Sequence, residues 1–177
     1  MPDVPAKLQA RLERVRLLFC DVDGILTDAS IYVGDAGEYK RFNVRDGLGI
    51  TIWRRQGFKT GWISARPSPA TSIRAAELSI DFLIQQRGSK VQSIEPILAR
   101  ENLGWEEVCY MGDDIVDLGP LDRAGFAVCV PPGHQEALKR AHYVTELAGG
   151  QGAVREVIEM ILRAQSRWEG IVREYLA

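Results

Sequence analysis

Short apolar runs alternate along the chain with segments of helical periodicity, and this alternation constrains the fold more than any other feature. The runs are continuously apolar, as is typical of strands whose two faces are both covered. Such strands, separated by helices, favour a mainly parallel sheet with helices on both faces. We therefore predict a doubly wound α/β fold. The predicted strands are Val15–Val22, Lys59–Ile63, Asp81–Ile84, Val108–Met111, Phe126–Val130 and a possible edge strand at Tyr143–Thr145.

Helix signals fill the spaces between these strands. Asp46 and Ser89 are predicted caps, and Pro96 is expected to bend or shorten the helix that contains it. Two β-prone runs, 29–33 and 38–44, flank a Gly-rich turn and predict a hairpin. The predicted helices are 46–55, 68–78, 90–102, 135–141 and a long terminal helix, 152–175.

The length of 177 residues fits one domain, 1–177, which includes the hairpin (about 29–44) and the C-terminal helix or tail (about 152–177). A net charge of −2 gives no electrostatic basis for binding nucleic acid or an anionic membrane.

No apolar run has membrane-spanning length, and residues 1–16 lack the apolar core of a secretory signal, so a cytoplasmic protein is expected. The three cysteines lie in strand-like runs and are predicted to be buried thiols, without a disulfide framework or zinc site.

Polar side chains follow the predicted strands at their carboxyl ends, where ligands bind in folds of this kind. Clustered carboxylates repel one another unless a cation lies among them, and an all-oxygen set favours Mg²⁺. A hydroxyl and basic groups beside them suit a phosphoryl group. Two carboxylates two residues apart could then supply a nucleophile and an acid/base. The residues in question are Asp21, Asp23, Ser64, Arg66, Lys90, Asp113, Asp114 and Asp117.

The order of these residues resembles the four motifs of the haloacid dehalogenase superfamily of phosphatases: DVDGILTD (21–28), Ser64, Lys90 and GDDIVD (112–117). Three further stretches resemble the capless branch that hydrolyses 3-deoxy-D-manno-octulosonate 8-phosphate. They are FNVRDG (42–47), ISAR (63–66) and AGGQGAVREV (148–157), and the resemblance covers roughly residues 17–165. It implies a Rossmann-like core with a hairpin protrusion and no cap domain. It also implies Mg²⁺, a small-molecule sugar-acid phosphate as substrate, and a homotetramer.

The resemblance also implies roles for individual acids. Asp21 corresponds to the nucleophile and a metal ligand, and Asp23 to the acid/base whose backbone carbonyl also contacts the metal. Asp113 corresponds to the third metal ligand. Asp114 and Asp117 leave two alternatives open: one binds metal-bound water or orients the lysine, and the other caps the following helix.

The remaining site residues are assigned by the same resemblance. Ser64 and Lys90 correspond to phosphate-binding groups. Arg66 and Arg74 correspond to arginines that hold the carboxylate and hydroxyls of the sugar. The segment that contacts substrate corresponds to Asn43, Val44, Arg45, Asp46 and Gly47, in which Asp46 could equally cap the next helix.

Two positions depart from the family pattern, and two other functions are open. Thr51 stands where Arg is frequent and Ala65 where Gly is usual, so the identity of the sugar acid stays open. A phosphatase for a nine-carbon sugar acid is the first alternative, which Arg66 disfavours because that group tends to carry Glu there. A catalytically silent oligomerisation module is the second, and the complete set of motif residues disfavours it. Apolar hairpin residues are expected to pack between subunits, namely Ile31, Tyr32, Val33, Tyr39 and Phe42.

Overall fold

A six-stranded parallel sheet forms the centre of the molecule, with strand order β5-β4-β1-β6-β7-β8. The computed structural model describes residues 6–35 and 37–176; residues 1–5, Ala36 of the predicted hairpin turn and residue 177 lie outside the described part. The strands of this sheet are β1 (Leu17–Asp21), β4 (Lys59–Ser64), β5 (Phe82–Gln85), β6 (Val108–Met111), β7 (Phe126–Cys129) and β8 (Tyr143–Val144).

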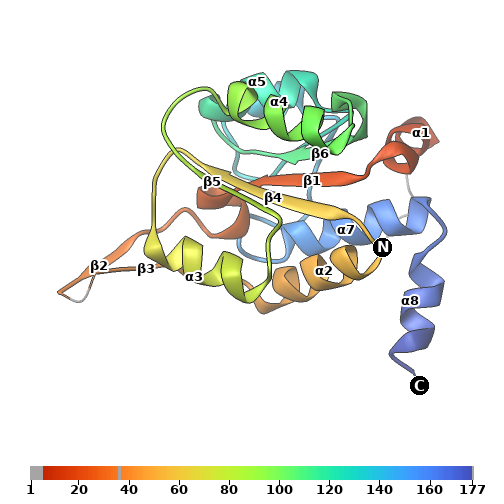
Figure 1. Ribbon diagram of the computed structural model, residues 1–177, viewed down its shortest axis with the longest axis horizontal. Helices are drawn as coiled ribbons and strands as arrows, with labels where there is room; N and C mark the ends of the chain where they lie inside the picture. The colour runs from red at the N-terminus through yellow and green to blue at the C-terminus, as the bar shows by residue number, and fades with distance from the viewer. Residues whose placement is uncertain (1–5, 36, 177) are drawn as a thin grey trace.

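Helices cover both faces of the sheet (Figure 1). One face packs against α1 (Ala6–Arg14), α2 (Val44–Arg55), α3 (Pro69–Glu77) and α7 (Ala153–Ala164). The other packs against α4 (Lys90–Glu101), α5 (Leu118–Arg123) and α6 (Gln135–Arg140). The short turns η1 (Val22–Leu26), η2 (Trp105–Glu107) and η3 (Ile115–Asp117) and helix α8 (Trp168–Glu174) complete the described elements. The predicted doubly wound α/β fold is confirmed.

The central strand β1 marks the point where the chain changes direction across the sheet. β1 pairs with β4 on one side and with β6 on the other, and all three strands run parallel. Their carboxyl ends therefore meet at one edge, and side chains that follow them gather there. Strands β1 and β6 are buried at every residue, which explains why their sequences are apolar apart from Asp21 at the end of β1.

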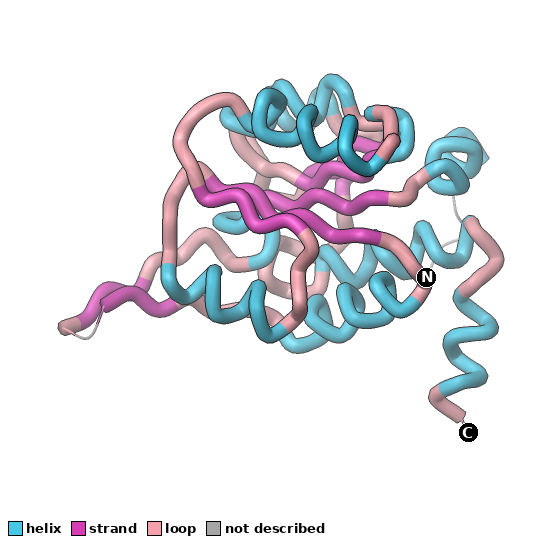
Figure 2. The backbone as a smooth tube through the Cα atoms, viewed as in Figure 1, coloured by secondary structure: helices cyan, strands magenta, loops and turns pink. Residues whose placement is uncertain are grey.

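The predicted hairpin forms and projects from the edge of the molecule where the strands end (Figures 1 and 2). It consists of β2 (Tyr32–Gly34) and β3 (Gly37–Tyr39), paired from Tyr32 with Tyr39 to Gly34 with Gly37. These strands are shorter than the predicted runs. Phe42 also differs from expectation, because it stacks on Trp62 with ring centroids 6.0 Å apart and, partly buried, packs against the core of its own chain.

Helix boundaries correct three predictions and add two helices. α2 begins at Val44 rather than at Asp46, because the Asn43 side chain accepts a hydrogen bond from the Arg45 N–H. α4 continues through Pro96 to Glu101. The prediction of one long terminal helix is wrong. The helix is interrupted at Ser166, whose φ of 56° lies in the left-handed region, and a second helix, α8, follows. Helices α1 and α5 were not predicted.

The three cysteines are buried free thiols, as predicted. None of the helices in the described part of the chain combines the length and the apolar character needed to cross a membrane.

Candidate active site

Asp21 lies at the carboxyl end of the central strand and pairs with a buried lysine. The Lys90 ammonium lies 2.5 Å from Asp21 Oδ1 and 2.7 Å from Asp117 Oδ1. Lys90 is the first residue of α4, held there by the Ser89 cap, whose hydroxyl accepts from the Gln92 N–H. Burial lowers the pKa of Lys90, but the charges of the two carboxylates outweigh it and raise the pKa above its ordinary value. The lysine is therefore a permanent cation between two acids.

Asp117 is fully buried and uses both carboxylate oxygens within the protein. Oδ1 accepts from Lys90 and from the Tyr110 hydroxyl, and Oδ2 accepts from the backbone N–H groups of Asp113 and Asp114. Asp114 is exposed and caps η3 by accepting from the Ile115 N–H. In the structure, Asp117 contacts the lysine and Asp114 caps η3.

Carboxylate oxygens of Asp21, Asp113 and Asp117 all lie within 4.8 Å of one another. Burial raises the pKa of Asp21 to about 7, Lys90 opposes the rise and Asp117 adds to it. Burial, together with the charges of Asp117 and Asp114, raises the pKa of Asp113 to about 6. Asp113 Oδ1 is buried without a hydrogen-bond partner among the described residues. A hard cation would satisfy this oxygen and relieve the repulsion, so the donor set fits Mg²⁺.

The turn after β1 brings the Asp113 carboxylate close to the backbone. Gly24 has a φ of +110°, and a Cβ at this position would lie 2.2 Å from Asp113 Oδ2. Both the backbone conformation and the close approach therefore require glycine. A further glycine, Gly149, packs against this turn. A Cβ on Gly149 would lie 1.7 Å from the Gly24 carbonyl oxygen. A cavity of about 260 Å³ opens beside Gly24 and Asp113.

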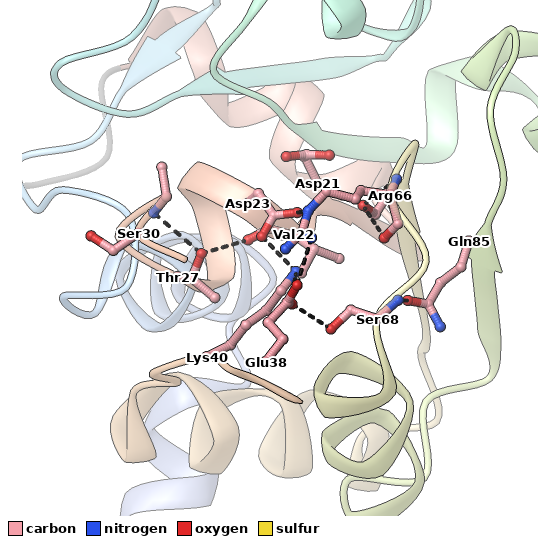
Figure 3. Close-up of polar contacts among 12 residues, drawn as sticks. Asp21, Val22, Asp23, Thr27, Ser30, Glu38, Lys40, Arg66, Ser68 and Gln85 are labelled. Carbon is pink, nitrogen blue, oxygen red and sulfur yellow. Dashed lines mark hydrogen bonds and ion pairs between the residues drawn. The ribbon is translucent and has the colours of Figure 1, made fainter. Parts of the chain in front are cut away.

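The side chain of Asp23 pairs with cations (Figure 3). The Lys40 ammonium lies 2.6 Å from Asp23 Oδ1, and Arg66 Nε lies 4.0 Å from Asp23 Oδ2. Arg66 also donates to Glu38. Sequence reasoning missed Glu38 and Lys40. Their spacing of two in an extended segment places them on one side of the chain, which is the signal that could have found them.

Ser64 lies at the carboxyl end of β4, one residue beyond the partner of Asp21 in the sheet. Its hydroxyl accepts from the Arg66 N–H at 3.0 Å and donates to the Arg66 carbonyl at 3.1 Å. These bonds fix the turn that carries the Arg66 side chain toward Asp23. Ser64 and Arg66 thus lie at the same edge as the carboxylates, as predicted.

The segment Asn43–Gly47 is divided between surface and core. Val44 and Arg45 are exposed, whereas Asp46 is buried and its Oδ1 accepts from the Arg155 N–H in the first turn of α7. Asp46 therefore caps α7, and the prediction that it caps its own helix is wrong. Burial raises the pKa of Asp46 to about 6, although backbone N–H groups of α7 oppose the rise.

Arg74 lies against this segment and not in the carboxylate cluster. It donates to Glu77 at 2.7 Å, and its Nη2 lies where a Cβ on Gly47 would be only 2.4 Å away. Thr51, at the position where the family often has Arg, donates to the Gly47 carbonyl oxygen. The structure therefore divides the predicted site residues into the carboxylate centre and a second group around Gly47.

Residues 61–158 match the family model described as haloacid dehalogenase-like hydrolase. The chain belongs to this family. The matched region contains Ser64, Lys90 and Asp113, and relatives that align along most of the chain extend the likeness beyond it.

Haloacid dehalogenase-like relatives of known name match nearly the whole chain. The 3-deoxy-D-manno-octulosonate 8-phosphate phosphatase of Escherichia coli (strain B / BL21-DE3) is 39% identical over 165 residues, covering 93% of this chain and 88% of that protein. The phosphatase of the same name from Yersinia pestis is 41% identical over 161 residues, covering 90% and 86%.

Solved structures of this family show the same fold. A crystal structure of 3-deoxy-D-manno-octulosonate 8-phosphate phosphatase from Moraxella catarrhalis, in complex with magnesium, phosphate and 3-deoxy-D-manno-octulosonate (KDO), has a TM-score of 0.92 at 34% identity. The match covers 96% of this chain and 98% of the Moraxella catarrhalis chain. The cobalt-bound phosphatase from Haemophilus influenzae has a TM-score of 0.89 at 30% identity, covering 94% and 99%.

Proposed function

We propose that this chain is a magnesium-dependent phosphatase that hydrolyses 3-deoxy-D-manno-octulosonate 8-phosphate to the free sugar acid and phosphate. The observation that carries the proposal is the carboxylate centre, in which Lys90 bridges Asp21 and Asp117 beside Asp113, one of whose oxygens has no hydrogen-bond partner among the described residues. The named relatives, similar along nearly the whole chain, support the choice of substrate.

Asp21 is the nucleophile. One carboxylate oxygen attacks phosphorus, the bond from phosphorus to the sugar oxygen breaks, and an aspartyl-phosphate forms. Asp23 gives its proton to the leaving oxygen and then takes a proton from the water that hydrolyses the aspartyl-phosphate. Lys90 and the Ser64 hydroxyl bind the oxygens of the phosphoryl group.

Mg²⁺ would be held by the carboxylates of Asp21 and Asp113 and by the backbone carbonyl of Asp23. When bound, it neutralises charge on the phosphoryl group and on the clustered acids. Asp117 keeps Lys90 in place, since its own oxygens already accept four hydrogen bonds. Asp114 contributes by capping η3, the turn that carries Asp117.

The leaving sugar acid contacts a wider group of residues. Arg66 holds its carboxylate, and the second group around Gly47 completes the sugar-binding surface where subunits meet. The members of that group are Asn43, Val44, Arg45, Asp46, Gly47 and Arg74. In this assignment Val44 and Arg45 contact the sugar acid, whereas in the single chain both side chains are exposed.

The protein works as a cytoplasmic homotetramer of one-domain chains that span 1–177. Apolar side chains on the hairpin support this assembly: Ile31, Tyr32, Val33 and Tyr39 are exposed by 48, 51, 83 and 58%. A two-stranded hairpin is marginally stable in water and gains stability when such faces are buried.

A phosphate-release screen tests the proposed function. The panel contains 3-deoxy-D-manno-octulosonate 8-phosphate, a nine-carbon sugar-acid 9-phosphate and neutral sugar phosphates, each with magnesium and with EDTA. We expect the eight-carbon acid to give the highest kcat/KM, EDTA to abolish turnover, and calcium not to replace magnesium because of its larger, looser coordination. Preference for the nine-carbon acid would reject the substrate, and no release from any member would indicate a silent module.

A further inference from the structure

Glu38, on strand β3 of the hairpin, is held by donors from another part of the chain (Figure 3). Its Oε2 lies 2.5 Å from Arg66 Nη1, and its Oε1 accepts from the Ser68 hydroxyl at 2.8 Å. The Lys40 ammonium lies 3.9 Å from the same Oε1. Two cations and one hydroxyl thus converge on a single carboxylate.

These donors form the chemical complement of a carboxylate. A guanidinium fork, an ammonium and a hydroxyl are the groups that bind such an anion most strongly. Ser68 is the N-cap residue of α3, yet its side chain makes no capping bond and its hydroxyl is directed to Glu38 instead. Arg66 Nη2 is buried without a hydrogen-bond partner in the described part of the chain, so the guanidinium has a donor to spare.

The same donors reach the proposed acid/base. Lys40 lies 2.6 Å from Asp23 Oδ1, and its side chain is fully buried. Because Asp23 protonates the leaving oxygen in the proposed reaction, the sugar acid must lie beside Asp23. The donors that Glu38 occupies adjoin Asp23 and are therefore within the span of a carboxylate carried at the other end of that sugar.

We propose that Glu38 is an internal stand-in for the substrate carboxylate. It occupies the site formed by Lys40, Arg66 and Ser68 until the carboxylate of a sugar-acid phosphate displaces it. The inference rests on the proposed function, and it adds Lys40 as a second cation for the acid and Glu38 as a built-in competitor. Displacement is feasible because β3 pairs only with β2 among the described strands, so Glu38 can leave with the hairpin.

Competition is measured by inhibition of p-nitrophenyl phosphate hydrolysis by free 3-deoxy-D-manno-octulosonate. Glu38→Gln should lower the inhibition constant of the sugar acid about two- to fivefold, the range expected when one partly exposed ion pair no longer competes. Glu38→Asp, whose shorter side chain reaches the donors less well, should shift the constant in the same direction by less. Inorganic phosphate, which has no carboxylate, should show no such shift.

Two further variants separate this inference from general electrostatics. Glu101→Gln removes an ion pair with Lys59 elsewhere on the surface and should leave the constant for the sugar acid unchanged. Lys40→Met should weaken inhibition by the sugar acid about tenfold and inhibition by phosphate less, and Lys40→Arg should restore most of the loss. Isothermal titration with the sugar acid repeats the comparison without turnover.

The reporter reaction keeps the two proposals separable. Absence of turnover with 3-deoxy-D-manno-octulosonate 8-phosphate would reject the proposed substrate. An inhibition constant for the sugar acid that is equal or higher in Glu38→Gln would overturn the competitor role of Glu38, whichever phosphate ester the protein hydrolyses.

Discussion

Single residues in this protein are held in unfavourable charge states that a ligand would relieve. Asp21 is buried and Asp113 half-buried; both acids have raised pKa values and lie close to a third acid, Asp117. Lys90 compensates part of this negative charge. Asp113 Oδ1 has no hydrogen-bond partner within the described part of the chain. The sequence predicted these four residues because the three acids lie at or shortly after the carboxyl ends of strands and Lys90 begins a helix. It did not predict Lys40 beside Asp23, because that contact joins a hairpin to a strand end and leaves no local pattern.

The nucleophile can be tested by removing its charge. Asp21→Asn should reduce turnover at least a thousandfold, because an amide is a poor nucleophile. Stability near neutral pH should hold or increase, since the ionised carboxylate is unfavourable in the folded state and Lys90 keeps Asp117 as partner. Phosphate release and thermal unfolding measure the two effects. Residual activity of a few per cent would exclude the covalent role.

Asp46 should make stability depend on pH. Its pKa is about 6 in the folded protein against an ordinary 3.8, so the folded state holds the proton more tightly. The contribution to stability is therefore present below about pH 4 and is lost as pH rises toward 6. The difference in unfolding free energy between wild type and Asp46→Asn should fall by on the order of 2–3 kcal/mol from pH 4 to pH 7. Urea unfolding at several pH values measures it, and a flat difference would contradict the assignment.

At the scale of elements, local pattern determined what forms, and distant contacts determined where elements begin and end. The periodicity of the last helix continues through Ser166, yet the helix breaks there, and Trp168 and Ile171 of α8 are buried. Asp46 has the residue type of a helix cap, but it caps α7, an element more than a hundred residues later. Propensity cannot distinguish these outcomes, because it carries no information about which surfaces meet.

The turn after β1 offers a test of one element with a matched control. Gly24→Ala adds a strained positive φ and a Cβ that would displace the Asp113 carboxylate. The Mg²⁺ concentration for half-maximal activity should rise at least about tenfold. Gly57→Ala adds the same kind of strain, at a φ of +84°, and no atom of residues 6–35 or 37–176 lies within 4 Å of the added Cβ. It should cost about 1–3 kcal/mol of stability without changing the magnesium requirement. Equal magnesium requirements in both variants would refute the steric argument.

The whole molecule presents its hairpin and its proposed site at the same end (Figure 1). Sequence patterning was sufficient for the fold class, because alternation of strand and helix leaves few topologies. It was insufficient for the surface: Phe42 packs against the core of its own chain, whereas Val33 is exposed by 83%. The exposure of the hairpin side chains depends on how the hairpin is oriented relative to the main sheet, and local sequence pattern does not predict that orientation.

Assembly can be tested with charges on the hairpin. Replacing Tyr32 by Lys and Val33 by Glu should convert a homotetramer of the 19.7 kDa chain into smaller species and lower activity, without unfolding the subunit. Ile73→Glu, on α3 and 71% exposed, should leave the assembly intact. Light scattering and circular dichroism measure mass and folding. A fully active monomer would refute the tetramer and leave the hairpin as a lid on its own site.

The position of β1 between β4 and β6 also sets the order in which this protein can become functional during synthesis. A ribosome releases Asp21 and β4 early, but β6 and Asp113 emerge only after β5 and α4. Until then β1 has one unpaired edge and the carboxylate centre lacks Asp113 and Asp117. A nascent chain therefore has neither a complete acidic cluster nor a second partner strand for β1, and β6 with the residues that follow it supplies both.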